Sequence, residues 1–138
     1  MNAEVPVGFE PSARTGPFLD LIGPVYTRTG EGGIQLGLRA RTEHCNARGL
    51  VHGAILAALL DVVCGRNCSA RAPSSPRMLT VSLTVDYVAS AQDGDWLEAS
   101  ATVTRAGRRL AFADGLVEAA GRPVAKASAV FAVAEPAP

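Results

Sequence analysis

The chain has 138 residues, 48% of them hydrophobic, and its 13 basic and 13 acidic side chains cancel. This length predicts one domain with a hydrophobic core, and the absence of net charge gives a nucleic-acid or anionic-membrane partner no electrostatic support. Three cysteines are an odd count and do not form a disulfide framework.

The ends and the cysteines give two further expectations. The N-terminal stretch "MNAEVPVGFEPSAR" has neither the basic region nor the apolar region of a secretion signal, so we expect a cytoplasmic protein. Cys64 and Cys68 lie four residues apart, but no second ligand pair has zinc-like spacing. We therefore expect free thiols and no metal site.

The first third of the chain predicts an arm, a helical turn and a hairpin. Residues 1–15 contain proline, glycine and alanine without periodicity, which indicates a flexible N-terminal arm ahead of a single domain over 16–138. An apolar stretch over 16–23, bracketed by prolines, fits a brief helical turn. Apolar residues then alternate along 34–38 after a glycine-rich turn, which is typical of a hairpin over 25–39.

The stretch "HCNARGLVHGAILAALLDVVCGRNC", residues 44–68, runs from a loop that holds both histidines into an almost wholly apolar segment. It predicts a helix over about Gly53–Asn67, and the proline- and serine-rich "SARAPSSPR" after it predicts a loop. Between His52 and Arg66 the single charged residue is Asp61.

After that loop the pattern changes to strands. In "MLTVSLTVDYV" one predicted face carries Leu79, Val81, Leu83, Val85 and Tyr87, and the other carries Thr80, Ser82, Thr84 and Asp86. Turns at "AQDGD", "AGR" and "AGRP" separate three further alternating segments, so we predict about four antiparallel strands in a meander.

The order of elements predicts an α+β fold: two strands, one long apolar helix, then four strands. A helix that is apolar all round needs cover on every side. An antiparallel sheet that wraps around the central helix supplies most of it, and a second molecule covers the remainder. This is a hotdog-like architecture, and it implies an oligomer.

Asp61 is unexpected in a helix whose other residues suit burial in a hydrophobic core. It follows Gly53 by about 12 Å along the axis, so it cannot reach the N-terminus of its own helix. In a two-fold dimer with antiparallel helices, each Asp61 would face the other helix N-terminus. That end offers free N–H groups and partial positive charge to a developing oxyanion, while the carboxylate suits a nucleophile or a general base. The pairing indicates acyl transfer to water.

A structural role for Asp61 stays open at this point. The carboxylate could face a solvent seam, pair with Arg66, or cap a neighbouring element. An unpaired buried carboxylate is costly, which favours some dedicated partner.

Asn46, Gly49, His52, Gly53 and Asp61 resemble the N-x-x-G-x-x-H-G-G…D signature of hotdog-fold acyl-CoA thioesterases of the PaaI type, within the 4-hydroxybenzoyl-CoA thioesterase superfamily. The likeness extends to "PFLDLIGPVY" and to "VDYVASAQDGDWLEASATVTRAGRRLAFADGLV", so it covers most of the chain. It implies a homodimer or homotetramer with the site at the subunit interface, an aryl or medium-chain acyl-CoA substrate, and no cofactor beyond the CoA of the substrate.

The resemblance also implies roles for single residues. The Gly53 N–H would polarise the thioester carbonyl, with Asp61 of the opposite subunit as nucleophile or general base. Asn46 would hold the carbonyl or the attacking water, and His52 would organise the start of the helix or contact the substrate. Thr80 would orient water. One of two arginines in the turn at "AGRRLAF" would bind the CoA phosphates, namely Arg108 or Arg109.

One departure from the signature and three alternatives are weighed against this reading. Ala54 replaces the second glycine of the signature, which bears on substrate preference more than on activity. A hotdog hydratase or dehydratase uses different loop chemistry, and a non-catalytic acyl-CoA sensor would keep CoA binding without Asp61. Cys45 beside His44 suggests a nucleophilic pair, but adjacency on a loop does not orient one, so we expect a packed or pocket-lining thiol.

Overall fold

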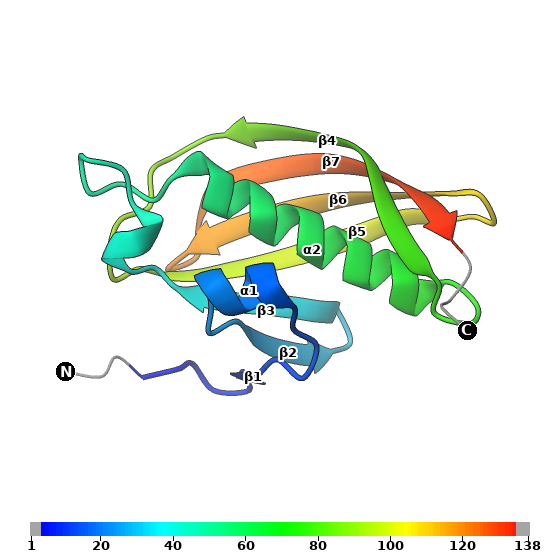
Figure 1. The fold of residues 1–138 in the computed structure, drawn as a ribbon, viewed down its shortest axis with the longest axis horizontal. Coiled ribbons are helices and arrows are strands. Elements are labelled where there is room, and N and C mark those ends of the chain that lie inside the picture. Colours follow the sequence, from blue (N-terminus) through cyan, green and yellow to red (C-terminus); the bar gives the residue numbers. More distant parts are fainter. Residues whose placement is uncertain (1–3, 135–138) are drawn as a thin grey trace.

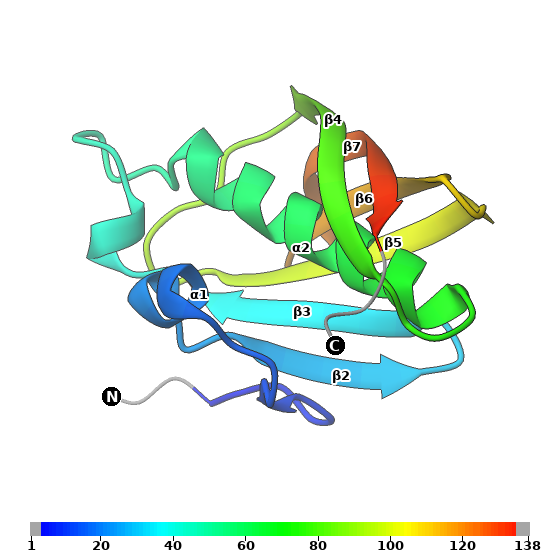
Figure 2. The ribbon, with the colours of Figure 1, turned by 45° about the vertical axis from the view of Figure 1, so that its right-hand side comes forward.

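The computed structural model describes residues 4–134 as one sheet folded around one long helix. The strands are β1 (Glu10–Pro11), β2 (Tyr26–Gly30), β3 (Gly33–Arg39), β4 (Arg77–Tyr87), β5 (Trp96–Ala106), β6 (Leu110–Ala119) and β7 (Arg122–Ala134). The helical elements are α1 (Pro17–Ile22), the 3-10 turn η1 (Thr42–His44) and α2 (Gly53–Arg71). The predicted α+β hotdog fold is confirmed: the antiparallel sheet curves around α2 (Figure 1, Figure 2).

The strand order is β1-β2-β3-β5-β6-β7-β4, with antiparallel pairing throughout. The meander therefore includes only β5, β6 and β7, and the predicted four-strand meander is wrong. β4 pairs with β7 at the far edge instead (Figure 1). The reason is the path of α2: the helix crosses the concave face after β3, so the next strand starts at the opposite edge.

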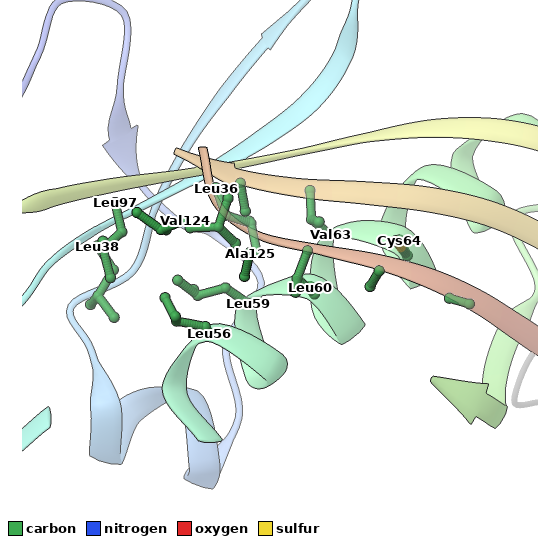
Figure 3. Packing of buried hydrophobic residues seen from close by; sticks show 14 of the residues in the cluster. Leu36, Leu38, Leu56, Leu59, Leu60, Val63, Cys64, Leu97, Val124 and Ala125 are labelled. Carbon is green, nitrogen blue, oxygen red and sulfur yellow. The ribbon is translucent and has the colours of Figure 1, made fainter. Parts of the chain in front are cut away.

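The buried face of α2 supplies the centre of the core. Leu56, Leu59, Leu60 and Val63 are at most 3% exposed and pack against side chains of β3, β5 and β7 (Figure 3). Each such side chain contributes about 1.5–3 kcal/mol through removal from water. A Cβ on Gly115 of β6 would lie 2.9 Å from Cys64 Sγ, so this glycine lets the helix approach the sheet closely.

α2 continues to Arg71, beyond the predicted end at Asn67. Asn67 is buried and binds the edge of β3, because its side chain accepts from Ile34 N at 3.0 Å and donates to Ile34 O at 2.9 Å. Cys68 is fully buried in the next position, and Pro73 follows the last turn. By length and composition α2 could cross a membrane, but core helices share both properties, and here it packs inside the sheet.

The N-terminal segment contacts the domain. β1 pairs with β2, and Phe9 is buried edge-on against Trp96 with ring centroids 5.3 Å apart. Part of the predicted flexible arm over 1–15 thus lies in the sheet, because an aromatic partner far along the chain holds it. Residues 1–3 of that arm lie outside the described part of the chain.

Candidate active site

Asp61 lies half-buried in the middle of α2 and is held by a residue of the edge strand. Thr80 Oγ1 on β4 donates a hydrogen bond of 2.6 Å to Asp61 Oδ1. Within residues 4–134, Asp61 makes no ion pair, and Arg66 instead donates to the carbonyl of Arg14 at 2.7 Å. The alternative of an Asp61–Arg66 bridge is therefore wrong.

A bulge in β4 is what brings Thr80 to Asp61. The register against β7 shifts between Thr80 and Ser82, so Thr80 faces the helix together with residues that follow the bulge, Leu83 and Val85. The predicted faces of this strand are wrong on the N-terminal side of the bulge: Thr80 points inward, and Leu79 and Val81 are 60% and 61% exposed. Perfect alternation cannot reveal an inserted residue.

Asp61 opens onto a groove of about 340 Å³ between α2 and β4. The carboxylate is thus accessible to a ligand while one of its oxygens is fixed by Thr80. The groove has a mixed lining of apolar and cationic side chains: Arg14, Asp61, Val62, Gly65, Arg66, Ser69, Pro76, Arg77, Met78, Leu79, Thr80 and Phe131.

The N-terminus of α2 presents a free backbone donor at Gly53. His52 is the N-cap, and its Nδ1 accepts from Ala54 N at 3.2 Å, which leaves its Nε2 as the protonated nitrogen of the neutral ring. The Gly53 N–H donates to no group within residues 4–134. Together with the helix dipole it forms a site for a partial negative charge.

Tyr87 covers this helix end, and sequence reasoning did not identify it. Its hydroxyl donates to Gly53 O at 3.0 Å, and a Cβ on Gly53 would lie 3.0 Å from its ring. The alternation of β4 placed Tyr87 on the apolar face of the strand, and it is 54% exposed. The glycine thus provides room for the tyrosine ring as well as for a ligand.

The loop before α2 is shaped by Asn46. Its Oδ1 accepts from Arg48 N at 2.9 Å and from Leu50 N at 3.2 Å, and Gly49 adopts a positive φ of 77° inside the turn. The amide oxygen of Asn46 is therefore used by the loop, and its NH₂ group is the part available to a ligand.

The two residues beside Asn46 do not form a nucleophilic pair. His44 is buried and accepts from Arg41 N at 3.0 Å through Nδ1, so Nε2 carries the proton and donates to Ile22 O at 2.7 Å. Burial, and then the charge of Asp93, raise the pKa of the Cys45 thiol. Both histidine nitrogens serve the structure, so neither is available as a base for Cys45.

The helix cysteines are buried, as their apolar surroundings predicted. Burial, followed by the lesser effects of Cys68 and Asp61, raises the pKa of the Cys64 thiol from 9.0 to about 12, and burial also raises the pKa of Cys68. Within residues 4–134 no group of three potential ligands could hold a metal ion. These thiols pack as small apolar side chains.

The predicted site residues fall into three groups within one chain. Asp61 and Thr80 meet at the middle of α2, whereas Asn46, His52 and Gly53 gather at its N-terminus, about 12 Å away. The exposed residues Arg108 and Arg109 lie in the β5–β6 turn, toward the C-terminal end of α2 (Figure 1). One chain therefore carries both halves of the predicted site without joining them.

Known proteins share both the sequence and the fold of this chain. The model of the thioesterase superfamily matches residues 48–126. A Pseudomonas aeruginosa protein named "Putative esterase PA0474" is 41% identical over 129 residues, which is 92% of this chain and 96% of that protein. A Caenorhabditis elegans protein named "Putative esterase F42H10.6" is 36% identical over 72 residues, 52% of this chain and 42% of that protein.

Solved structures of other proteins have a fold similar to that of this chain. A Ralstonia eutropha protein described as a "putative thioesterase, phenylacetic acid degradation-related protein" has a TM-score of 0.78 and 26% identity, and the match covers 88% of this chain and 92% of that one. A Bacillus halodurans protein solved with CoA has a TM-score of 0.79 at 24% identity, with 91% and 83% covered, and shows the same fold.

The match to the family model and to the Pseudomonas aeruginosa protein defines a hotdog-fold thioester hydrolase. The chain belongs to the thioesterase superfamily. The resemblance that the signature around His52 and Gly53 indicates is confirmed at this level.

Proposed function

We propose that the protein hydrolyses an acyl-CoA thioester, with an aryl or medium-chain acyl group, to the free acid and CoA, and that each site joins Asp61 of one subunit to Gly53 of another. The observation that carries the proposal is Asp61, which opens into a groove while Thr80 fixes one of its oxygens. The family supports thioester hydrolysis in general, and CoA is bound by a Bacillus halodurans protein of the same fold.

The chemistry follows from the two halves of the proposed site, which are the α2 N-terminus of one subunit and Asp61 of the other. The Gly53 N–H and the helix dipole polarise the thioester carbonyl, and the Asn46 amide group adds a second donor to the carbonyl or to water. As a nucleophile, Asp61 attacks the carbonyl carbon, the CoA thiolate leaves, and water cleaves the resulting anhydride. As a general base, Asp61 takes a proton from water, the water attacks, and the proton passes to the departing thiolate. No cofactor is needed in either route.

An edge strand supports the dimer that this mechanism requires. β4 has one neighbour, β7, and its apolar residues Leu79 and Val81 are at least 60% exposed. An exposed apolar edge strand is avoided by a monomer, and a second copy paired there by a two-fold axis would cover it. A homodimer, or a homotetramer built from two, is the proposed assembly.

The other residues of the proposed site position the reacting groups or bind the substrate. His52 caps α2 and so holds the Gly53 N–H in place. Arg108 or Arg109 binds the CoA phosphates, since both are exposed on a turn. The reaction takes place in the cytoplasm.

Thiol release from a panel of aryl and aliphatic acyl-CoAs tests the proposal. We expect at least one acyl class to be turned over by the wild-type protein, with the preferred class identifying the acyl group. CoA esters that bind without release of thiol would instead support the sensor alternative.

Gly65 gives a prediction about the groove. This glycine lies inside α2, where glycine costs about 0.5–1 kcal/mol relative to alanine, and an added Cβ would have ordinary contact, 3.4 Å, with the ring of Phe131. We expect Gly65→Ala to raise the free energy of unfolding by about that amount. Because the methyl group enters the groove, turnover of bulky acyl groups should fall relative to acetyl-CoA. Denaturant unfolding and thiol release measure the two effects, and equal turnover for all acyl sizes would show that the acyl group lies elsewhere.

A further inference from the structure

The lining of the groove beside Asp61 contains cationic side chains as well as apolar ones. The guanidinium groups of Arg14 and Arg66 line it, against the single carboxylate of Asp61. Neither Arg14 nor Arg66 makes an ion pair within residues 4–134. The groove therefore has an excess of cations close to the proposed reacting carboxylate.

Arg14 and Arg66 are brought together by the N-terminal segment. Arg66 donates to Ser12 Oγ at 3.1 Å and to the backbone oxygen of Arg14 at 2.7 Å, so the segment is bound to α2 at the groove. Burial, and then the charge of Arg14, lower the pKa of Arg66. Two arginines that repel one another, one of them half-buried, are stabilised when an anion binds between them.

Their place in the same groove as Asp61 distinguishes between anions of the substrate. Arg66 follows Asp61 by five residues, a rise of about 7.5 Å along the helix axis. The phosphates of CoA lie at the far end of the long pantetheine arm, whereas a substituent on the acyl group lies close to the thioester. The apolar residues of the same groove, Val62, Met78 and Phe131, suit the carbon chain between the thioester and such a substituent.

We propose that Arg14 and Arg66 form a subsite for a carboxylate at the end of the acyl group, so that the preferred substrates are CoA monothioesters of dicarboxylic acids. The inference rests on the proposed function, because it takes the thioester carbon to lie at Asp61. It specifies the class of acyl group, which membership of the thioesterase superfamily does not determine.

A matched pair of substrates tests it: adipoyl-CoA and hexanoyl-CoA, which have the same chain length and differ in the terminal carboxylate. A charge-assisted hydrogen bond predicts that wild-type kcat/KM for adipoyl-CoA exceeds that for hexanoyl-CoA by about tenfold or more. Arg14→Gln removes one charge but keeps the backbone oxygen that Arg66 binds, so it should bring the ratio of kcat/KM for adipoyl-CoA to kcat/KM for hexanoyl-CoA close to one. Arg66→Lys should keep part of the preference that Arg66→Gln loses. Arg71→Gln, an exposed arginine of the same helix outside the groove, is the control and should behave as wild type.

Two results would overturn the subsite. A wild-type enzyme that shows no preference for adipoyl-CoA lacks it, even though the thioesterase activity stands. Arginine variants that lose activity equally with both substrates would show that the cations bind CoA phosphates. If no thioester is hydrolysed, calorimetry with the non-hydrolysable carboxypentyl and hexyl thioethers of CoA gives the answer independently: the carboxylate must still increase affinity in wild type and not in Arg14→Gln.

Discussion

Asp61→Asn is expected to lower kcat for thiol release by about a hundredfold or more, the size expected when a general base or nucleophile is removed. The substitution keeps the shape of the side chain, and its amide oxygen still accepts the hydrogen bond that Thr80 donates at 2.6 Å. The fold and the β4 edge should therefore be preserved. Steady-state kinetics with the best acyl-CoA of the panel measure the loss, and equilibrium binding of CoA should be retained.

Thr80→Val provides the matched comparison for this prediction. Valine has nearly the shape of threonine but donates no hydrogen bond, so it leaves Asp61 charged and unfixed. We expect a smaller loss than for Asp61→Asn, because the reacting group remains and only its orientation is disturbed. Equal activity of wild type and Asp61→Asn would show that the carboxylate is structural and would remove the basis of the proposed mechanism.

The elements around the site were predictable where they leave a periodic pattern. The apolar run after Gly53 indicated α2, and the one charge within it indicated Asp61. The hairpin over 25–39 and the helical turn over 16–23 follow from alternation and from glycine and proline, and β2, β3 and α1 confirm them. These features depend on short stretches of sequence.

The features that were not predictable depend on contacts between distant segments. The β4 bulge that turns Thr80 toward Asp61 breaks the alternation used to assign its face. The hydrogen bond between Arg66 and Ser12 joins residues 54 positions apart, and such pairs leave no pattern in either segment. The same holds for Tyr87 over Gly53, which is recognisable only after β4 is placed at the sheet edge.

The contribution of the helix N-terminus can be isolated with Gly53→Pro and Gly53→Ala. Proline is accepted at the first position of a helix, and His52 before it has ψ of 137°, the conformation that proline requires of its predecessor. Both substitutions add the same Cβ near Tyr87, but only proline removes the N–H. We expect Gly53→Pro to lower kcat by about a hundred- to a thousandfold relative to Gly53→Ala, the effect of one oxyanion donor.

Mixing two inactive variants then tests whether the site is shared between chains. In a dimer of one Asp61→Asn chain and one Gly53→Pro chain, one site carries both substitutions and the other carries neither, because Asp61 and Gly53 of each site come from different chains. Co-unfolding and refolding an equal mixture should therefore recover about a quarter of wild-type activity, since half of the dimers are mixed and each has one intact site. If each site were built within one chain, every site in the mixture would carry one substitution and no activity would return. Recovery of activity is thus expected only from a shared interface, and its absence with intact dimers would place both groups in a single subunit.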